Sequence, residues 1–289
     1  PAINDGVVSA DIYSSSSNSS AKLLLRAVAS EGAPVWRLKI TSASNEFTVS
    51  RLVLPTLPSI PVKLRETGQP GVYALHASHD DWWSEIEVHA SPFQLQLRVG
   101  RVGDTKATSG PPAVVFNGNG LLRFAADDPS SDASVACVAK GRAPTHEGFT
   151  DSVPHGCTAI AADVSFPGAV AAFGLPERAA PLALPFTMRK LQRAAVDPAT
   201  GAATPEQTTA TEWAELSAQP HRLFNLDVFQ YEPGTPVSVY GSLPYLMAHG
   251  VESAAAILWL NAADTYVDVW EGEAMAMADE GIGSAWLSE

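Results

Sequence analysis

The sequence predicts an all-β fold, a β-sandwich of many mostly antiparallel strands. Apolar and polar residues alternate at period two in 93–99 (FQLQLRV), which is typical of a strand buried on one face. Similar short segments recur along the chain, separated by turns rich in glycine and proline. The sequence contains no long amphipathic helix with clear capping residues. Many short strands joined by such turns favour two sheets packed face to face.

The expected strands follow one another at short intervals. In chain order they are 21–30, 34–41, 71–78, 84–90, 93–99, 113–116, 158–166, 236–241, 256–261 and 265–270. Turns are expected at 66–70 (ETGQP), 117–120 (NGNG) and 166–168 (FPG).

Three stretches have compositions that bury little apolar area. They lie near 14–20, 125–146 and 189–220 and are rich in serine, in small and acidic residues, or in threonine. We expect loop insertions or disorder there. None of them has the character of an interdomain linker, so residues 1–289 are expected to form one domain.

Composition and charge exclude several functions. Of the 289 residues, 46% are hydrophobic, enough for a large core. The net charge of −13 repels phosphate backbones, so no nucleic-acid partner is expected. No run of eighteen apolar residues exists, so no membrane span is expected.

Cysteine and histidine usage favours neither a metal site nor a cofactor. The two cysteines, Cys137 and Cys157, are 20 positions apart, and no histidine lies at ligand spacing from them. Two free thiols and one disulfide remain open alternatives. Asn18 begins an N-glycosylation sequon within a serine run, which fits a loop of a secretory-pathway protein.

The residues by themselves reveal no self-contained active site. The alternating strands and helices of a βα-barrel are absent from the sequence, as are the common hydrolase, phosphate-binding and zinc-protease motifs. The paired acids at 80–81 and 127–128 stand in polar turn sequence, so we interpret them as solvated loop residues.

Five segments point to a known family. In order they are 163–168 (DVSFPG), 173–179 (FGLPERA), 222–232 (RLFNLDVFQYE), 239–246 (VYGSLPYL) and 258–268 (LWLNAADTYVD). In order and spacing they resemble the segment that precedes the barrel in glucosidase II-type α-glucosidases of glycoside hydrolase family 31. The resemblance extends from about residue 90 to the end and is thin before it.

The resemblance implies both a fold and a function. The fold is a galactose-mutarotase-like β-sandwich, and its partner is the enzyme's barrel domain, which holds both catalytic carboxylates. This chain is therefore expected to contain no catalytic residue and to be inactive alone. The whole enzyme would be a retaining α-glucosidase that trims glucose from the N-glycans of nascent glycoproteins in the endoplasmic reticulum lumen. Its further partner would be a non-catalytic β subunit, forming a heterodimer.

Asp227 and Phe229 are the candidate substrate-binding residues. The resemblance implies that their loop reaches the barrel mouth, where Asp227 accepts hydrogen bonds from sugar hydroxyls and Phe229 packs on the sugar ring. The alternative is structural, with Asp227 capping a turn and Phe229 lying in the core.

Other prominent residues are interpreted as structural. Glu177, in a Gly/Pro turn, is expected to hold its loop through backbone N–H groups rather than to act in catalysis. Arg178 replaces the family's usual histidine, which suggests a structural ion pair. Adjacent strand residues point to opposite faces, so at most one of Trp82 and Trp83 faces a ligand, and core packing is favoured.

Two alternatives to an enzyme part are considered, a stand-alone binding module and a mutarotase. The chain is either part of an enzyme or a stand-alone carbohydrate-binding or interaction sandwich, and the coding sequence after Glu289 would discriminate between them. A secreted mutarotase would need a His/Glu acid–base pair, and none of the seven histidines lies in a motif that singles it out.

Overall fold

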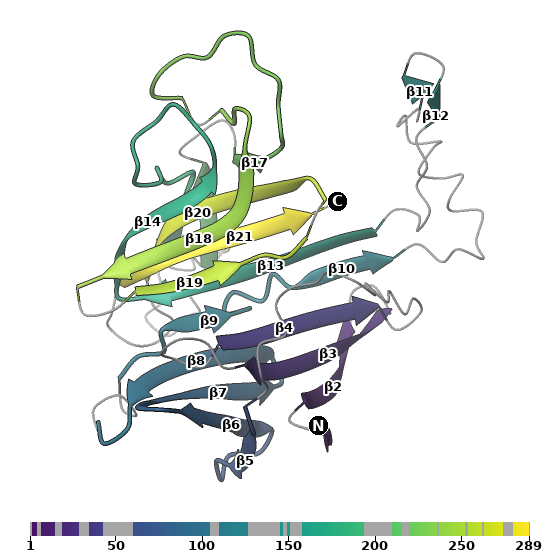
Figure 1. Cartoon of the computed structure of the whole chain (residues 1–289), viewed down its shortest axis with the longest axis vertical. Helices are drawn as coiled ribbons and strands as arrows, with labels where there is room; N and C mark the ends of the chain where they lie inside the picture. The colour runs from purple at the N-terminus through teal and green to yellow at the C-terminus, as the bar shows by residue number, and fades with distance from the viewer. Residues whose placement is uncertain are drawn as a thin grey trace, which may run out of the picture. The chain divides into compact units, whose positions relative to one another are not determined.

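The computed structural model shows an all-β protein, as predicted (Figure 1). It describes residues 2–4, 7–14, 19–28, 35–42, 60–104, 110–126, 145–146, 149–150, 158–193, 210–215, 220–235, 237–251, 254–261, 263–273 and 280–288. Over these ranges the chain forms strands and no helix. Strand pairs of known register are antiparallel, except that β15 and β20 run parallel.

The chain divides into two compact units. Unit 1 is Pro1–Ala162 with Leu287–Glu289, and unit 2 is Asp163–Trp286. The division falls within one strand, β13 (Thr158–Pro167), rather than in a linker. The single domain over 1–289 stays a prediction.

Unit 1 contains two main sheets, with strand orders β1-β2-β3-β4 and β9-β8-β7-β6-β5. The strands are β1 (Ala2–Asn4), β2 (Val7–Ser14), β3 (Ser19–Val28), β4 (Val35–Ser42), β5 (Lys63–Glu66), β6 (Val72–His79), β7 (Trp82–Ala90), β8 (Phe93–Arg101) and β9 (Val114–Phe116). In addition, β10 (Arg123–Ala126) pairs with β13, and β11 (Thr145–His146) pairs with β12 (Phe149–Thr150).

The core of unit 1 lies between these sheets. Leu75, Ile86 and Leu95 are buried on one face of β6, β7 and β8. Trp36 and Leu38 of β4 pack against them, so the two sheets face each other as in a sandwich. Each large apolar side chain buried in this way contributes about 1.5–3 kcal/mol.

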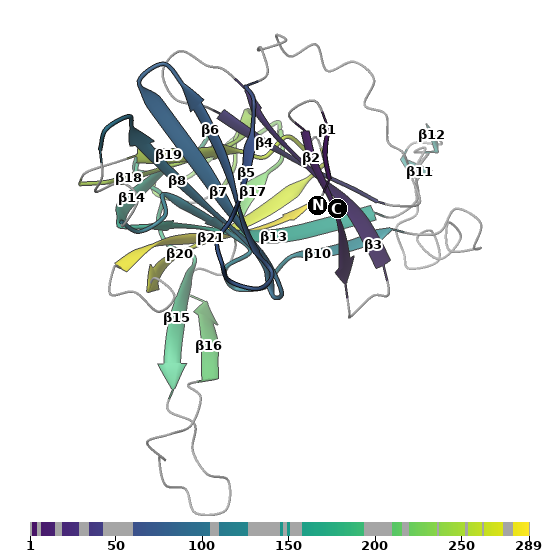
Figure 2. The ribbon, with the colours of Figure 1, turned by 90° about the horizontal axis from the view of Figure 1, so that it is seen from below.

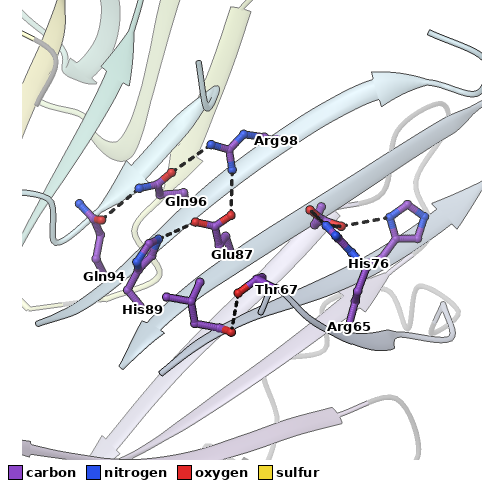
Figure 3. A network of polar contacts seen from close by, with 10 residues as sticks. Arg65, Thr67, His76, Glu87, His89, Gln94, Gln96 and Arg98 are labelled. Atoms are coloured by element: carbon purple, nitrogen blue, oxygen red, sulfur yellow. Dashed lines mark hydrogen bonds and ion pairs between the residues drawn. The ribbon is translucent and has the colours of Figure 1, made fainter. Parts of the chain in front are cut away.

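The opposite face of the β5–β8 sheet is polar. We call it the polar face (Figure 3), and its residues are Arg65, His76, Glu85, Glu87, His89, Gln94, Gln96 and Arg98. Arg65 donates two hydrogen bonds to Glu85, of 2.8 and 3.0 Å. Glu87 contacts His89 at 2.7 Å and Arg98 at 3.5 Å. The acidic side chains of this face thus have partners on it, and Glu87 is joined to Arg98 across the neighbouring strands β7 and β8.

Unit 2 also contains two sheets, with orders β16-β15-β20-β21-β13 and β14-β18-β19, and β17 pairs with β20. The strands are β14 (Ala169–Pro176), β15 (Met188–Arg193), β16 (Ala210–Glu215), β17 (His221–Leu223), β18 (Ser242–Gly250), β19 (Ala254–Leu258), β20 (Thr265–Glu273) and β21 (Glu280–Ser288). Trp259, which follows β19, stacks on Trp286 of β21 with ring centroids 5.6 Å apart. This stack joins the two sheets of unit 2.

Most expected strands are present, but one is wrong. The clearest pattern, 93–99, lies in β8, and the turn at 117–120 is closed by Asn117, which accepts a hydrogen bond from Leu122 N. The described part of 236–241, by contrast, is not a strand. Ser238 and Val239 are both buried there, which breaks the alternation, and the Ser238 hydroxyl turns inward to donate to the Arg222 carbonyl.

The stretch near 189–220 contains strands that its composition did not predict. In it β15 and β16 pair in register from Met188↔Glu215 to Arg193↔Ala210, side by side in Figure 2. Backbone pairing forms this hairpin, whereas the loop prediction considered only apolar burial. The central parts of all three stretches lie outside the described residues, and Asn18, Cys137 and Cys157 lie there too.

Candidate functional site

Asp227 and Phe229 lie in one surface loop between β17 and β18. We call it the Asp227 loop (residues 224–241, of which Pro236 is not described). Near its base, the Leu226 N–H donates to the Val239 carbonyl at 3.0 Å. The Ser242 hydroxyl donates to the Phe224 carbonyl at 2.9 Å. The two arms of the loop are therefore tied together where they leave the sheet.

Glu177, at the end of β14, anchors one of these arms. Its N–H donates to the Gly241 carbonyl at 2.8 Å, and its own carbonyl accepts from the Val239 N–H at 2.9 Å. Its carboxylate accepts a further hydrogen bond from the Gly241 N–H at 3.0 Å. The prediction that Glu177 holds a loop through backbone N–H groups is confirmed.

The backbone before Glu177 has an unusual conformation. Gly174 has φ +104°, and the buried Leu175 has φ +63°, a region that non-glycine residues rarely adopt. A Cβ atom at position 174 would overlap the Tyr245 carbonyl oxygen of β18. Glycine is therefore needed for β14 to approach β18 closely just before it ends at Pro176.

Arg178 ties down the neighbouring turn. Its guanidinium donates to the Gly174, Pro181 and Leu182 carbonyls, each at 2.9 Å. It forms no ion pair with any carboxylate that the structure describes, so the expected ion pair is wrong. The carbonyls take the place of the acid, because the turn at 174–182 surrounds the side chain. Partial burial lowers the pKa of Arg178.

His221 lies at the foot of the loop, on β17, and is fully buried. Its Nε2 is 3.2 Å from the Pro185 carbonyl. Burial lowers the pKa of His221, and the nearby positive charge of Arg178 lowers it further. The hydrogen bond to Pro185 opposes both effects. The net effect is to disfavour the charged imidazolium in the folded protein.

The tip of the loop differs from its base. Asp227 is exposed, and its carboxylate has no hydrogen-bond or ion-pair partner among the described residues. Phe229 is 100% exposed and Tyr231 55% exposed. The alternative with Phe229 in the core is therefore wrong, and Asp227 caps no backbone N–H in the described structure. An acceptor and two aromatic rings face solvent within five positions.

One further residue of the loop was missed by the sequence interpretation. The Tyr240 hydroxyl donates to the Val228 carbonyl at 2.7 Å, between the two candidate residues. Tyr240 stands in the segment 239–246, which served only as a family marker. A tyrosine next to a turn glycine carries no pattern that predicts such a hydrogen bond.

The tryptophan pair has a structural role. Trp83 is buried, as predicted, but on the side of the sheet that carries the polar face, where it donates from Nε1 to the Arg101 carbonyl at 3.1 Å and stacks on His76. Trp82 is half-buried and lies under the Arg101 guanidinium, 5.0 Å from the ring centroid.

The described part of the chain contains neither a metal-binding cluster nor a membrane-spanning helix. Within it, no three His, Cys, Asp or Glu side chains are grouped so as to hold a metal ion. The same residues include no helix with the length and hydrophobicity to span a membrane.

The fold matches solved structures of glucosidase II. One of them is the crystal structure of an ER glucosidase II heterodimeric complex, which consists of the catalytic subunit and the binding domain of the regulatory subunit. Its catalytic subunit aligns with this chain at a TM-score of 0.67 and 22% identity. A Glc1Man2-bound glucosidase II alpha subunit gives 0.67 and 23%. Both alignments cover 100% of this chain and 30% of the solved chain. The class is thus a β-sandwich protein with the fold of part of these subunits.

The family follows from the sequence. The sequence-family model of the glycosyl hydrolase 31 N-terminal galactose mutarotase-like domain matches residues 29–268. This chain belongs to that family.

Curated relatives agree with this assignment. A probable glucan 1,3-alpha-glucosidase of Oryza sativa subsp. japonica is 30% identical over 255 residues, which are 86% of this chain and 24% of the relative. The glucosidase 2 subunit alpha of Schizosaccharomyces pombe is 28% identical over 71% of this chain and 19% of its own length. The chain therefore spans about a quarter or less of these relatives.

Proposed function

We propose that this chain is the N-terminal portion of a glucosidase II-type α-glucosidase and that it presents substrate-contacting groups on the Asp227 loop. The observation that carries the proposal is the contrast within that loop. Its base is tied to Glu177 by three hydrogen bonds, whereas the Asp227 carboxylate and the Phe229 ring are exposed and unpartnered in the described structure. Membership of the family 31 N-terminal domain supports it.

The chemistry of the tip suits a sugar. An ionised carboxylate accepts charge-assisted hydrogen bonds from hydroxyl groups. An exposed aromatic ring packs against the apolar C–H face of a pyranose. Asp227 and Phe229 would thus bind the sugar on the leaving-group side of the cleaved bond and orient it, which lowers the activation barrier. The two carboxylates of a retaining mechanism would lie in the barrel of the same enzyme.

The names of the relatives support a substrate class and a compartment. Two relatives are named as probable glucan 1,3-alpha-glucosidases, which favours an α-1,3-linked glucose as the group removed. One solved relative is an ER glucosidase II complex with part of a regulatory subunit. We infer that the enzyme trims glucose from N-glycans in the endoplasmic reticulum lumen as a heterodimer with a non-catalytic β subunit.

The test compares two substrates in the complete protein that carries this chain. Asp227→Ala is expected to lower kcat/KM for an α-1,3-linked glucose disaccharide about tenfold or more, because one charge-assisted hydrogen bond is lost. Cleavage of a small aryl α-glucoside, which lacks the second sugar, should change little. The matched control is Asp81→Ala, an exposed aspartate in the β6–β7 turn.

Equal losses on both substrates, or no loss on either, would argue against a contact with the leaving-side sugar. The 289-residue chain alone should release no product from a chromogenic α-glucoside. Turnover by the pure chain would contradict the placement of the catalytic carboxylates elsewhere.

A further inference from the structure

We propose that Tyr240 is a positioning residue that fixes the tip of the Asp227 loop through the carbonyl of Val228. This inference rests on the proposed function of Asp227 and Phe229, which are the chain neighbours of Val228. It assigns a distinct task to the Tyr240 hydroxyl, which is to hold the backbone between two contact residues while itself touching no substrate.

The backbone of Tyr240 is held on both sides. Its preceding neighbour Val239 donates to the Glu177 carbonyl at 2.9 Å, and its following neighbour Gly241 is bonded twice to Glu177. Glu177 itself follows the close approach of β14 to β18 at Gly174. The phenol of Tyr240 therefore extends from a fixed support, and the position of its hydroxyl is set by the sandwich.

The Tyr240 hydroxyl connects this fixed backbone to the tip of the loop. It donates to the Val228 carbonyl at 2.7 Å, a good length for an O–H···O hydrogen bond. In the described part of the loop, this is the only hydrogen bond that joins residues 227–231 to other residues. No other described hydrogen bond holds the peptide that joins Asp227 to Phe229.

A fixed tip favours binding for an entropic reason. An unrestrained exposed segment must be ordered when the substrate arrives, and this ordering lowers affinity. A neutral hydrogen bond of ordinary strength that pre-orders the tip corresponds to a factor of about three to ten in substrate affinity. The effect should appear in KM for a substrate that reaches the tip.

The kinetic test uses Tyr240→Phe in the complete protein. KM for the α-1,3-linked disaccharide is expected to rise about three- to tenfold with a smaller change in kcat. Both constants for an aryl α-glucoside should stay as in the wild type. Tyr231→Phe is the matched control, because Tyr231 is equally exposed in the same loop, and its hydroxyl has no partner in the described structure.

A second measurement does not depend on activity. Backbone amide order parameters of Val228 and Phe229 in the 289-residue chain should fall in Tyr240→Phe from about 0.85 toward 0.6 or below. They should stay unchanged in Tyr231→Phe. Unchanged values in Tyr240→Phe would overturn the proposal, as would an equal fall in both variants.

The two proposals fail separately. If Asp227→Ala leaves disaccharide cleavage intact, the substrate contact is wrong, whereas the order parameters still decide whether Tyr240 fixes the tip. If Asp227→Ala weakens disaccharide cleavage while Tyr240→Phe matches the wild type in both measurements, the contact stands and the positioning role is overturned.

Discussion

The polar face of unit 1 and the Asp227 loop of unit 2 both carry acidic side chains. The two regions differ in whether these acids have hydrogen-bond or ion-pair partners. On the polar face, each glutamate has a described partner, since Glu85 is bonded to Arg65 and Glu87 contacts His89 and Arg98. In the loop, hydrogen bonds join the base to Glu177 and one joins Tyr240 to the Val228 carbonyl, but the Asp227 carboxylate has no partner in the described structure.

The difference separates polar groups that serve stability from those that remain available to a ligand. A carboxylate already bonded to an arginine must lose that bond before it binds anything else. A free carboxylate loses only its hydration. Acidic residues alone therefore do not indicate a site, and Asp227 is a candidate because it is unpartnered in the described structure while the base of its loop is held by hydrogen bonds.

The largest expected effect comes from breaking the anchor of the loop. Gly174→Ala should lower the free energy of unfolding by about 3 kcal/mol or more, because the new Cβ meets the Tyr245 carbonyl at a positive φ. Urea unfolding measures this loss. Gly168→Ala is the control: Gly168 also has a positive φ, +75°, but a Cβ there has open space, so about 1 kcal/mol is expected. Equal losses in the two variants would contradict the close approach of β14 and β18.

A smaller effect compares the two acids directly. Glu87→Gln should cost about 1 kcal/mol of stability, because Arg98 and His89 lose a charged partner at a half-buried position. Asp227→Asn should stay within about 0.5 kcal/mol of the wild type, since its carboxylate stabilises nothing described in the fold. Both are measured by urea unfolding at neutral pH. A loss in Asp227→Asn as large as that in Glu87→Gln would remove the distinction between the two regions.

The smallest expected effect is the loss of stability at acidic pH. His221 has a folded-state pKa below its ordinary value of 6.5, mainly because it is buried. As the pH falls through 6.5, the unfolded chain therefore binds a proton before the folded chain does. The contribution of neutral His221 to the free energy of unfolding should be fully present above pH 6.5. It should be lost progressively as the pH falls from 6.5 toward the lowered pKa of the folded state. Unfolding measured from pH 7.5 to 5.5 should show a shallower decline in His221→Asn, and an identical decline would exclude His221 as its source.

The sequence predicted those parts of the fold that depend on local alternation. The segment 93–99 lies in β8, where Leu95 is buried and Gln94 and Gln96 lie on the polar face. Alternation failed at 237–241, because Ser238 and Val239 are both buried and the segment bonds to Glu177 and Leu226 instead of to a continuous partner strand. Such isolated bonds between distant residues leave no periodic pattern.

The geometry of the candidate site was predicted only in part, and the substrate contact of Asp227 and Phe229 stays a prediction. Resemblance to a family indicated Asp227 and Phe229, and the turn sequence at 173–177 indicated the holding role of Glu177. The carbonyls that take the place of an expected acid around Arg178 come from a turn within four residues of it, and the hydrogen bond from Tyr240 to Val228 spans 12 residues. Both depend on the path that the backbone takes in space. Single-residue types do not encode that proximity.

The anchoring of the loop has a consequence for how such a domain changes over time. Three of the hydrogen bonds at its base join main-chain atoms of Glu177, Val239, Gly241 and Leu226, which every non-proline residue possesses. Side chains at the tip can therefore be exchanged while the frame stays in place. Under the function proposed above, replacing the side chains of Asp227 and Phe229 would change which sugar binds next to the cleaved bond without changing the frame of the loop.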